Sequence, residues 1–272
     1  MKVYCILGDE RAFRTKSPVM FSRVMRKVGL RAAYVPFKVR PDCVGQAIQS
    51  LRILNIAGAN VTVPYKEAVV THMDILSEGA NIIGAINTIV RDGDTLKGYN
   101  TNAIGIMDAL VESGFEAEGK SALIFGTGGA AMAAAFIFNW LRTGTIYLTG
   151  RNQTKCRNLV ERFGGKAIPL NEVADDSPPV HIDVNATSVS SDDESSTMSA
   201  LVSELDLPDG ELVLDLNYGR DQNFWRDLAQ KNKIRFIDGL TPLAYQARRT
   251  FALWTGLQVP PEEFIKALDE SE

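Results

Sequence analysis

The chain has 272 residues, of which 45% are hydrophobic and 23% charged, the composition of an ordinary globular protein with one or two domains. Its formal net charge of −4 at pH 7 argues against a nucleic-acid or anionic-membrane surface, and no apolar run approaches the roughly 20 residues that cross a bilayer. The three cysteines, Cys5, Cys43 and Cys156, lack metal-clip spacing, and the N-terminus has no cleavable signal. We therefore expect reduced thiols, no metal site and a cytoplasmic protein.

The first half of the chain alternates short apolar strands with amphipathic helices. Strands are expected at 2–7, 32–39, 56–63, 86–90 and 95–99, and helices at 17–28, 43–54, from 67 to about 77 and from 100 to 113. Ser17 followed by Pro18 predicts an N-cap and a first helical position, and Asp92-Gly-Asp94 predicts a hairpin turn. The alternation indicates an α/β protein with a largely parallel sheet.

A glycine turn opens the second half. The apolar run 121–125 enters Gly126-Thr-Gly-Gly-Ala-Ala131, and a small-residue helical stretch follows. The spacing of Gly126, Gly128 and Ala131 fits G-x-G-x-x-G/A, in which small residues allow a tight turn, close approach of a pyrophosphate and close helix packing. The helix N-terminus then faces the anion. The motif predicts a dinucleotide site, although a lone match also occurs in ordinary tight strand–helix turns.

Strands and helices continue to alternate after the glycine turn. We expect strands at 145–149, 166–170, 180–184, 211–216 and 235–238, and helices from about 154 to 163, 223–231, 240–254 and 261–268. Segments 171–180 and 190–199 are acidic or polar and predict loops. The second unit therefore begins near residue 120, inside the chain, so the last helix is free to return to the first unit.

The end of the second strand of this unit indicates which nicotinamide cofactor is bound. An NAD site usually carries an acidic residue there for the ribose 2′-hydroxyl, whereas this chain has Gly150 and Arg151, with Lys155 one turn later. An arginine at this position can face a 2′-phosphate and stack on adenine. We favour NADP, with NAD possible; the alternative is a solvated basic helix start.

Lys66 is the candidate reactive group of the first half. It follows the strand-like stretch Gly58-Ala-Asn-Val-Thr-Val-Pro, which carries polar Asn60 and Thr62. A lysine at a strand end beside an apolar cleft loses hydration and can act as an acid or base. Taken alone, a single lysine is more often a solvated surface charge.

Eight ordered motifs now identify a resemblance to the shikimate dehydrogenase family, including its quinate/shikimate relatives. They cover nearly the whole chain and are Thr15-Lys-Ser-Pro18, Gly58-Ala-Asn-Val-Thr-Val-Pro-Tyr-Lys66, Gly84-Ala-Ile-Asn-Thr88, Gly98-Tyr-Asn-Thr-Asn102, Gly126-Thr-Gly-Gly-Ala130, Asn185-Ala-Thr-Ser188, Asp215-Leu-Asn-Tyr218 and Asp238-Gly-Leu-Thr-Pro-Leu-Ala-Tyr-Gln246. The resemblance implies an α/β fold with an N-terminal substrate-binding catalytic domain (1–105), a Rossmann-type NADP-binding domain (106–240), a C-terminal segment (about 240–272) returning to the first domain, and a cleft between them.

The resemblance also implies NADP-dependent, reversible reduction of 3-dehydroshikimate to shikimate, a step of the chorismate pathway to aromatic amino acids. Lys66 would be catalytic, together with position 102. The substrate would be bound by Thr15 and Ser17 at its carboxylate and by Thr62, Asn87, Tyr218 and Gln246 at its ring hydroxyls. The cofactor would be bound by Glu78, Gly126, Thr127, Gly128, Gly129, Ala130, Arg151, Asn152, Leu216 and Gly239.

Asn102 departs from the family pattern, because the family has an aspartate there. The amide of asparagine has the size of the aspartate carboxylate, but it carries no charge and exchanges no proton. Because Lys66 then lacks an opposite charge beside it, we expect its pKa to be lowered. The departure predicts either a slow or disabled shikimate dehydrogenase or a relative tuned to another substrate. Asn102 also suits the cap of the helix that follows.

The sequence leaves three hypotheses about function. The first is the dehydrogenase, acting on shikimate or else on quinate or another hydroxy-carboxylate. The second is a catalytically disabled homologue that still binds ligands, and the third is an enzyme of a folate-like carrier with a related two-domain plan. The expected partners are a small-molecule substrate, no nucleic acid, no membrane, and a monomeric or homodimeric state.

Overall fold

A computed structural model describes residues 1–173 and 178–269, and the chain divides into two compact units. The first comprises Met1–Gly105 and Leu243–Glu272, and the second comprises Ile106–Pro242. The chain leaves the first unit within α4 (Thr101–Glu112) and re-enters it within α9 (Leu240–Thr255). Part of the loop expected at 171–180, residues 174–177, lies outside the described residues. In the described part of the chain, no helix is both long and apolar enough to cross a membrane.

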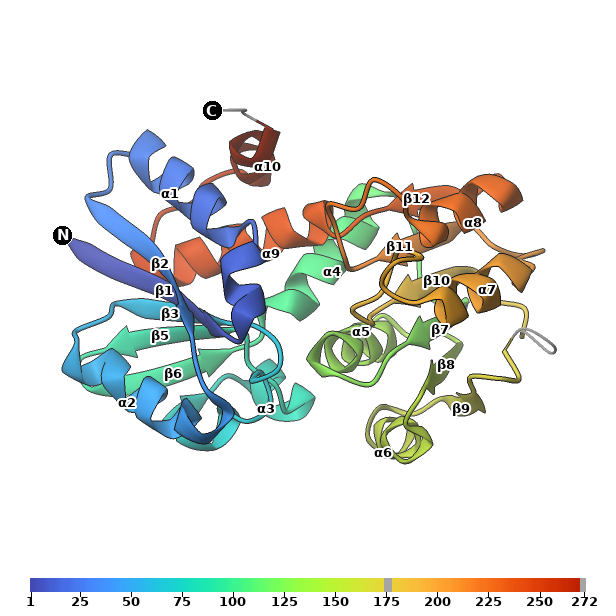
Figure 1. Cartoon of the computed structure of the whole chain (residues 1–272), viewed down its shortest axis with the longest axis horizontal. Coiled ribbons are helices and arrows are strands. Elements are labelled where there is room, and N and C mark those ends of the chain that lie inside the picture. The colour runs from blue at the N-terminus through green and yellow to red at the C-terminus, as the bar shows by residue number, and fades with distance from the viewer. Residues whose placement is uncertain (174–177, 270–272) are drawn as a thin grey trace. The chain divides into compact units, whose positions relative to one another are not determined.

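The first unit is built on a mixed six-stranded sheet (Figure 1). Its strands, in sheet order, are β2 (Ala32–Lys38), β1 (Lys2–Gly8), β3 (Gly58–Val61), β5 (Thr88–Asp92), β6 (Thr95–Tyr99) and β4 (Ile75–Leu76). β1 pairs in parallel with β2 and β3, whereas β5 runs antiparallel to both β3 and β6. The expected hairpin is present, since Asp92 pairs with Thr95 across Gly93 and Asp94.

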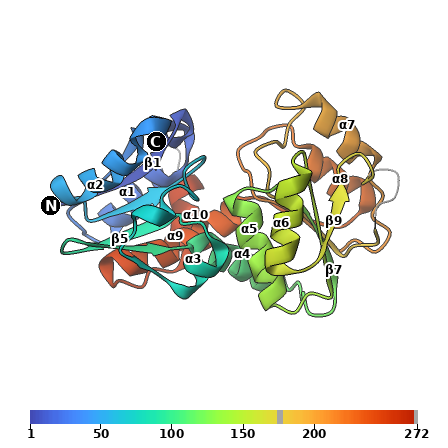
Figure 2. The ribbon, with the colours of Figure 1, turned by 90° about the horizontal axis from the view of Figure 1, so that it is seen from below.

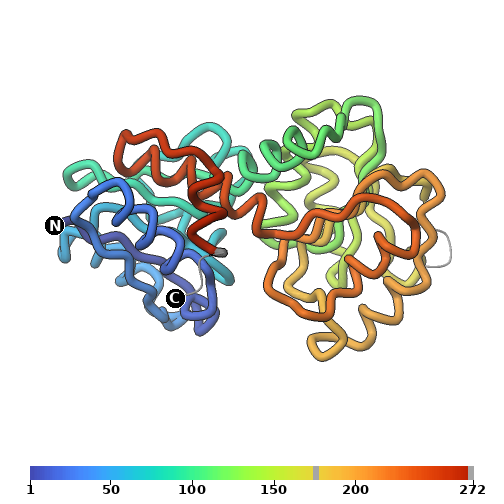
Figure 3. The backbone as a smooth tube through the Cα atoms, turned by 90° about the horizontal axis from the view of Figure 1, so that it is seen from above, coloured from blue at the N-terminus to red at the C-terminus, as the bar shows by residue number. Residues whose placement is uncertain are grey.

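Helices cover both faces of this sheet because the central strands are apolar on both sides. They are α1 (Ser17–Lys27), α2 (Val44–Ile53), α3 (Glu78–Ile83), α9 and α10 (Pro261–Asp269), with 3-10 turns η1 (Glu10–Arg14), η2 (Pro41–Cys43) and η3 (Val70–His72). α2 packs on a cluster that includes Leu7, Ile48 and Val61. Figure 3 follows the last segment of the chain back to the first, where α10 contacts α1.

The second unit has an all-parallel six-stranded sheet. Its strands, in sheet order, are β12 (Arg235–Ile237), β11 (Leu212–Asp215), β10 (Ile182–Asn185), β7 (Ser121–Phe125), β8 (Thr145–Gly150) and β9 (Lys166–Pro169). The first strand of the unit, β7, lies in the middle between β8 and β10. This is the doubly wound order, whose ligand site lies at the carboxyl ends of the strands where the strand order reverses. The expected Rossmann-type fold is confirmed.

Four helices pack on this sheet in two pairs: α5 (Gly129–Trp140) and α6 (Gln153–Phe163), and α7 (Ser196–Glu204) and α8 (Phe224–Asn232). Figure 2 shows α5 and α6 side by side. The α7–α8 pair covers an apolar cluster that includes Leu123, Val213 and the fully buried Trp225.

Several local expectations were wrong. Ser17 is the first residue of α1 and not its cap, which is Lys16. The helix expected from 67 to 77 is replaced by turns, η3 and the short strand β4, because the chain pairs with β6 there: the N–H of Asp74 donates to Leu96 and that of Ser77 to Gly98. The loop expected at 190–199 gives way to α7 at Ser196, which Ser195 caps.

Candidate functional site

One edge of the sheet of the first unit collects the polar residues that the sequence singled out. β1 and β3 are parallel and both end there, and the antiparallel pairs Asn60–Thr88 and Thr88–Tyr99 bring the start of β5 and the end of β6 to the same edge. Five of the predicted site residues follow or precede these strand ends: Thr15, Thr62, Lys66, Asn87 and Asn102. Polar side chains at strand ends of an α/β sheet are where ligands bind.

Asn87 is the centre of this cluster. Its Oδ1 accepts the backbone N–H of Thr101 at 2.7 Å. Its Nδ2 lies 2.8 Å from Thr101 Oγ1, 2.5 Å from Asn102 Oδ1 and 2.9 Å from Gln246 Oε1. Gln246 comes from α9, far along the chain, so this amide joins three separated segments. The structure therefore brings together the predicted residues Asn87, Asn102 and Gln246.

Three buried threonines form a hydrogen-bonded group next to Asn87. The sequence did not predict this role for them. The hydroxyls of Thr88, Thr101 and Thr250 lie 2.9–3.1 Å from one another. Each hydroxyl donates once and accepts twice, so a ring of three satisfies all its donors and still accepts from Asn87 and Asn60. Asn60 in turn accepts from Tyr34, and this continuous network fixes the position of Asn87.

Asn100, not Asn102, caps α4. Its Oδ1 accepts the N–H of Ala103 at 3.2 Å, and its own amide donates to the carbonyl of Ala85. The capping role that the sequence left open for Asn102 therefore falls to its neighbour. The amide of Asn102, which is half-buried, is committed to Asn87 instead.

Lys66 lies beside this cluster through its backbone, since its carbonyl accepts the N–H of Ile86 at 2.7 Å. No hydrogen bond or ion pair joins its Nζ to any residue that the structure describes. Burial lowers the pKa of Lys66 to about 8, and no carboxylate acts against this shift. The expected lowering is confirmed, with loss of hydration as its cause. An amine with this pKa exchanges protons near neutral pH.

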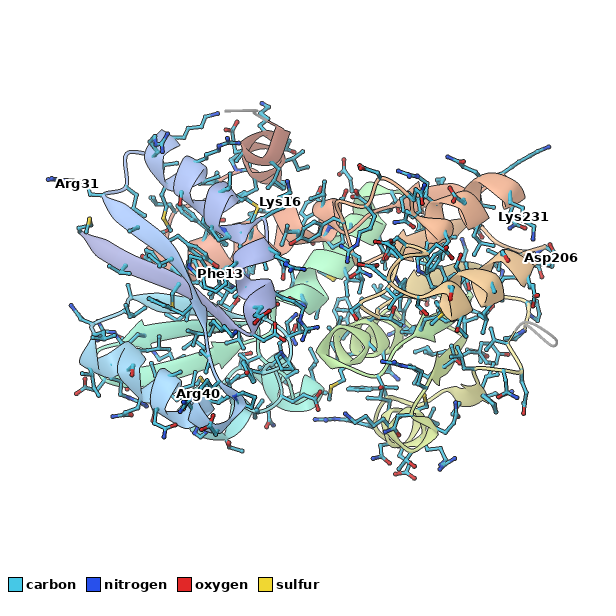
Figure 4. The ribbon with its side chains drawn as sticks, viewed as in Figure 1. Phe13, Lys16, Arg31, Arg40, Asp206 and Lys231 are labelled. Atoms are coloured by element: carbon cyan, nitrogen blue, oxygen red, sulfur yellow. The ribbon has the colours of Figure 1, made fainter. Side chains whose placement is uncertain are left out.

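The two hydroxyls expected to hold a carboxylate follow η1. Ser17 is buried at the start of α1, and Thr15 is half-buried with a long 3.4 Å contact from its Oγ1 to the carbonyl of Ala12. Their neighbours Phe13 and Lys16 are labelled in Figure 4. Thr62 reaches the same edge, because a Cβ on Gly8 would lie 2.4 Å from its methyl group. Glycine at position 8 thus leaves room for Thr62 at the end of β3.

In the second unit, the glycine turn has the form that a pyrophosphate site requires. Gly126 has φ +116°, and a Cβ there would lie 2.8 Å from the carbonyl oxygen of Ala186, after the neighbouring strand β10. A Cβ on Gly128 would meet no atom, so the N-terminus of α5 faces open space. The fully buried Ala131 packs this helix on its sheet. The residues present fit a dinucleotide, whose anion would meet the N–H groups of Gly128, Gly129 and Ala130.

Arg151 and Asn152 follow β8, the next strand of this sheet. Asn152 caps α6 by accepting the N–H of Lys155 at 3.0 Å. Arg151 is exposed, and its guanidinium forms no hydrogen bond or ion pair with a described residue. No carboxylate occupies this strand end, where an NAD site usually has one. The side chain of Thr127 contacts this strand end, 3.3 Å from a Cβ built on Gly150.

A second polar network fixes the loops after β10 and β11. Asp215 is fully buried, and its carboxylate accepts from Asn185 and Asn223 at 2.8 Å and from the backbone of Asn217 at 3.0 Å. Burial raises the pKa of Asp215, while these hydrogen bonds act against the shift. A Cβ on Gly239 would lie 2.5 Å from the carbonyl of Leu216, which explains the glycine there.

The remaining predicted residues divide between the units. Tyr218 follows β11, and its carbonyl accepts from Arg220, which also pairs with Glu194 at 2.8 Å. Glu78 is exposed at the start of α3, in the first unit, so it does not share a unit with the glycine turn. Within the described residues, no group of three histidine, cysteine or acidic side chains could hold a metal ion.

Comparison with known proteins reveals one family. Residues 10–89 match the model of the shikimate dehydrogenase substrate binding domain. A shikimate dehydrogenase (NADP(+)) of Desulforamulus reducens is 37% identical over an alignment of 253 residues, with 90% of this chain and 87% of the relative covered. The crystal structure of shikimate dehydrogenase from Aquifex aeolicus has a TM-score of 0.88 at 27% identity, covering 99% of this chain and 98% of the other. Shikimate 5-dehydrogenase of Thermus thermophilus, solved with NADP(H) and shikimate, has a TM-score of 0.85 at 30% identity, with 99% of both chains covered.

Proposed function

The chain belongs to the shikimate dehydrogenase family, and from this premise we propose that it catalyses the NADP-dependent, reversible reduction of 3-dehydroshikimate to shikimate. This is a step on the way to chorismate and the aromatic amino acids. The observation that carries the proposal is the unpaired Lys66, with its pKa near 8, beside the Asn87 cluster of the first unit. The glycine turn of the second unit supplies a cradle for the cofactor.

Lys66 acts as the acid and base of this reaction. NADPH, when bound, supplies the hydride. As the ketone becomes an alcohol, negative charge develops on its oxygen, and the ammonium group of Lys66 stabilises that charge and delivers the proton. In the reverse direction the neutral amine takes the proton back. A pKa of about 8 leaves both forms populated near neutral pH.

The other predicted side chains hold the substrate. The hydroxyls of Thr15 and Ser17 bind the ring carboxylate, and the groups that bind the ring hydroxyls are Thr62, Asn87, Tyr218 and Gln246. These groups suit a polyol, because a hydroxyl both donates and accepts hydrogen bonds and an amide NH₂ group donates to a ring oxygen. Asn102 completes the catalytic pair in place of an aspartate.

NADP is the proposed cofactor because a basic residue, Arg151, stands where an NAD site has an acid. The turn residues 126–130 would hold the pyrophosphate, with Asn152, Leu216, Gly239 and Glu78 as further contacts. Three free thiols suit the cytoplasm, and a monomeric or homodimeric enzyme remains the prediction.

A substrate and cofactor panel tests the proposal. We expect oxidation of shikimate with NADP, slower or no oxidation of quinate, and weaker use of NAD. Replacing Arg151 by serine should weaken NADP about 10- to 100-fold with little effect on NAD, because a hydrogen bond to a charged group is lost. Arg157→Ser, an exposed arginine on α6, is the matched control. Turnover of quinate alone would assign the site to that substrate, and ligand binding without turnover in both the wild type and Asn102→Asp would make the chain a binding protein.

A further inference from the structure

The amide groups around Asn87 have orientations that can be deduced from one backbone group. The N–H of Thr101 can only donate, and it lies 2.7 Å from Asn87 Oδ1. That contact fixes the oxygen of Asn87 toward α4. The NH₂ group of Asn87 therefore lies on the other side of the amide, where its two protons are shared among three oxygens, those of the Thr101 hydroxyl, Asn102 and Gln246.

The orientation of Asn87 determines that of its two partners. With an NH₂ group facing them, Asn102 and Gln246 must each turn their oxygen inward, at 2.5 and 2.9 Å. Flipping either amide would set NH₂ against NH₂, a contact of two donors with no acceptor. Their own NH₂ groups therefore point away from Asn87. Both residues are only half-buried, and neither NH₂ group bonds to a residue that the structure describes.

We propose that Asn102 and Gln246 are specificity-determining residues that present only hydrogen-bond donors, so that this part of the site selects a ligand oxygen that accepts without donating, as a ketone oxygen does. The proposal rests on the proposed function and adds to it which form of the substrate is favoured. Asn102 is the decisive position, because a carboxylate there would present an acceptor instead.

The residue types in the cluster also favour a ketone over an alcohol. Among the predicted catalytic and substrate residues of the first unit and their partner Thr101, Lys66 is ionisable, and the others are hydroxyls and amides: Thr15, Ser17, Thr62, Asn87, Thr101, Asn102 and Gln246. An alcohol must place its own O–H proton on an acceptor, and the outward groups of Asn102 and Gln246 offer none. A ketone has no such proton, so it loses no hydrogen bond here.

Binding of a matched ligand pair tests this inference. Calorimetry without cofactor gives the Kd of 3-dehydroshikimate and of shikimate, which differ at one oxygen, for the wild type, Asn102→Asp and Asn102→Ala. We expect the wild type to bind the ketone about tenfold more tightly. Asn102→Asp should reverse or abolish that preference, and Asn102→Ala should fall between. The titrations are run at pH 6, where Lys66, with a pKa of about 8, is charged in the wild type and stays charged in Asn102→Asp, because the added carboxylate raises that pKa. The ratio then isolates the donor or acceptor at position 102.

Gln246→Glu is the second variant, because it also turns an outward donor into an acceptor while keeping the oxygen that Asn87 contacts. It should shift the ratio in the same direction. The inference is overturned by a wild type that prefers the alcohol, or by a ratio that is the same in the wild type and both acidic variants. The expected ratios without turnover would refute the proposed reaction and leave this inference standing. Failure of both ligands to bind would refute both.

Discussion

As the proposed acid and base, Lys66 should determine how the reaction depends on pH. With its pKa lowered to about 8, the ammonium form that donates a proton to the ketone is lost above that pH, and the neutral form that accepts a proton from the alcohol is gained. Reduction should therefore slow above pH 8, while oxidation should reach its plateau there. The measurement is kcat/KM in each direction between pH 6 and 10.

Substitution of the same residue gives the matching test. Lys66→Met keeps most of the apolar stem and removes the proton carrier, so turnover should fall about 10²- to 10⁴-fold with little change in NADP binding. Asn102→Asp adds an opposite charge to the cluster beside Lys66 and should move the inflection to higher pH. An inflection that persists in Lys66→Met would assign the titration to another group.

Position 102 also shows what the sequence could and could not reveal about single residues. The motif predicted that Asn102 belongs to the site and that Lys66 has a lowered pKa, because both follow from residue type and place in the chain. It could not predict the orientation of the amide, which depends on Asn87 and on the N–H of Thr101. Thr250 was missed altogether, since nothing local marks a threonine that meets Thr101 from 149 positions away.

At the scale of elements, β10 carries an unusual buried carboxyl group. Asp183 lies in register with Leu123 and Val213, which belong to the apolar cluster beneath α7 and α8. Both of its carboxylate oxygens are buried without a hydrogen-bond partner in the described part of the chain, and burial raises its pKa to about 8. Such an unsatisfied group costs about 1–3 kcal/mol.

Replacing Asp183 by valine should therefore stabilise the second unit by about that amount and change how stability depends on pH. The folded pKa lies above the unfolded value near 3.9, so the unfolded state binds fewer protons, and stability is lost as the pH rises from about 4 to about 8. The advantage of the variant should grow over that window. Urea unfolding of both proteins at pH 5, 7 and 9 measures it; a constant difference would contradict the prediction.

Helices and strands were predicted well where burial and hydrophobic periodicity indicate the same element. They were predicted poorly where pairing with a strand distant in the sequence determines the local structure. The strands of the second unit are apolar on both faces, so their runs could be recognised as a parallel sheet. Residues 67–77 have apolar side chains at helical spacing, yet their backbone serves β6 through Asp74 and Ser77. Helical periodicity also does not show which large apolar residues stay in solvent: Trp140 is 63% exposed at the end of α5, whereas Trp225 and Trp254 are buried.

For the whole molecule, the order of the chain has a consequence for folding. The second unit is continuous from residue 106 to 242, whereas the first needs residues from both ends. α9 and α10 supply Phe251, Trp254 and Phe264, which pack around Phe21 and Tyr4 in one aromatic cluster. Truncating a buried aromatic to alanine costs about 3–5 kcal/mol, so losing three approaches the 5–15 kcal/mol that stabilises a whole domain.

A chain that ends at Pro242 should therefore keep its second unit folded and lose its first. Hydrogen exchange read by peptide should find protected amides in the strands between 121 and 237 and rapid exchange between 2 and 99. The point substitution Phe264→Ala, in a residue that is fully buried in the full chain, should lower the protection of the first unit without affecting the second. Because the glycine turn, where we propose that the pyrophosphate binds, lies within 106–242, the truncated chain should still gain protection around that turn when NADP is added. Equal loss of protection in both units would mean that the second depends on the first for its stability, and the continuity of its sequence would then explain nothing about its folding.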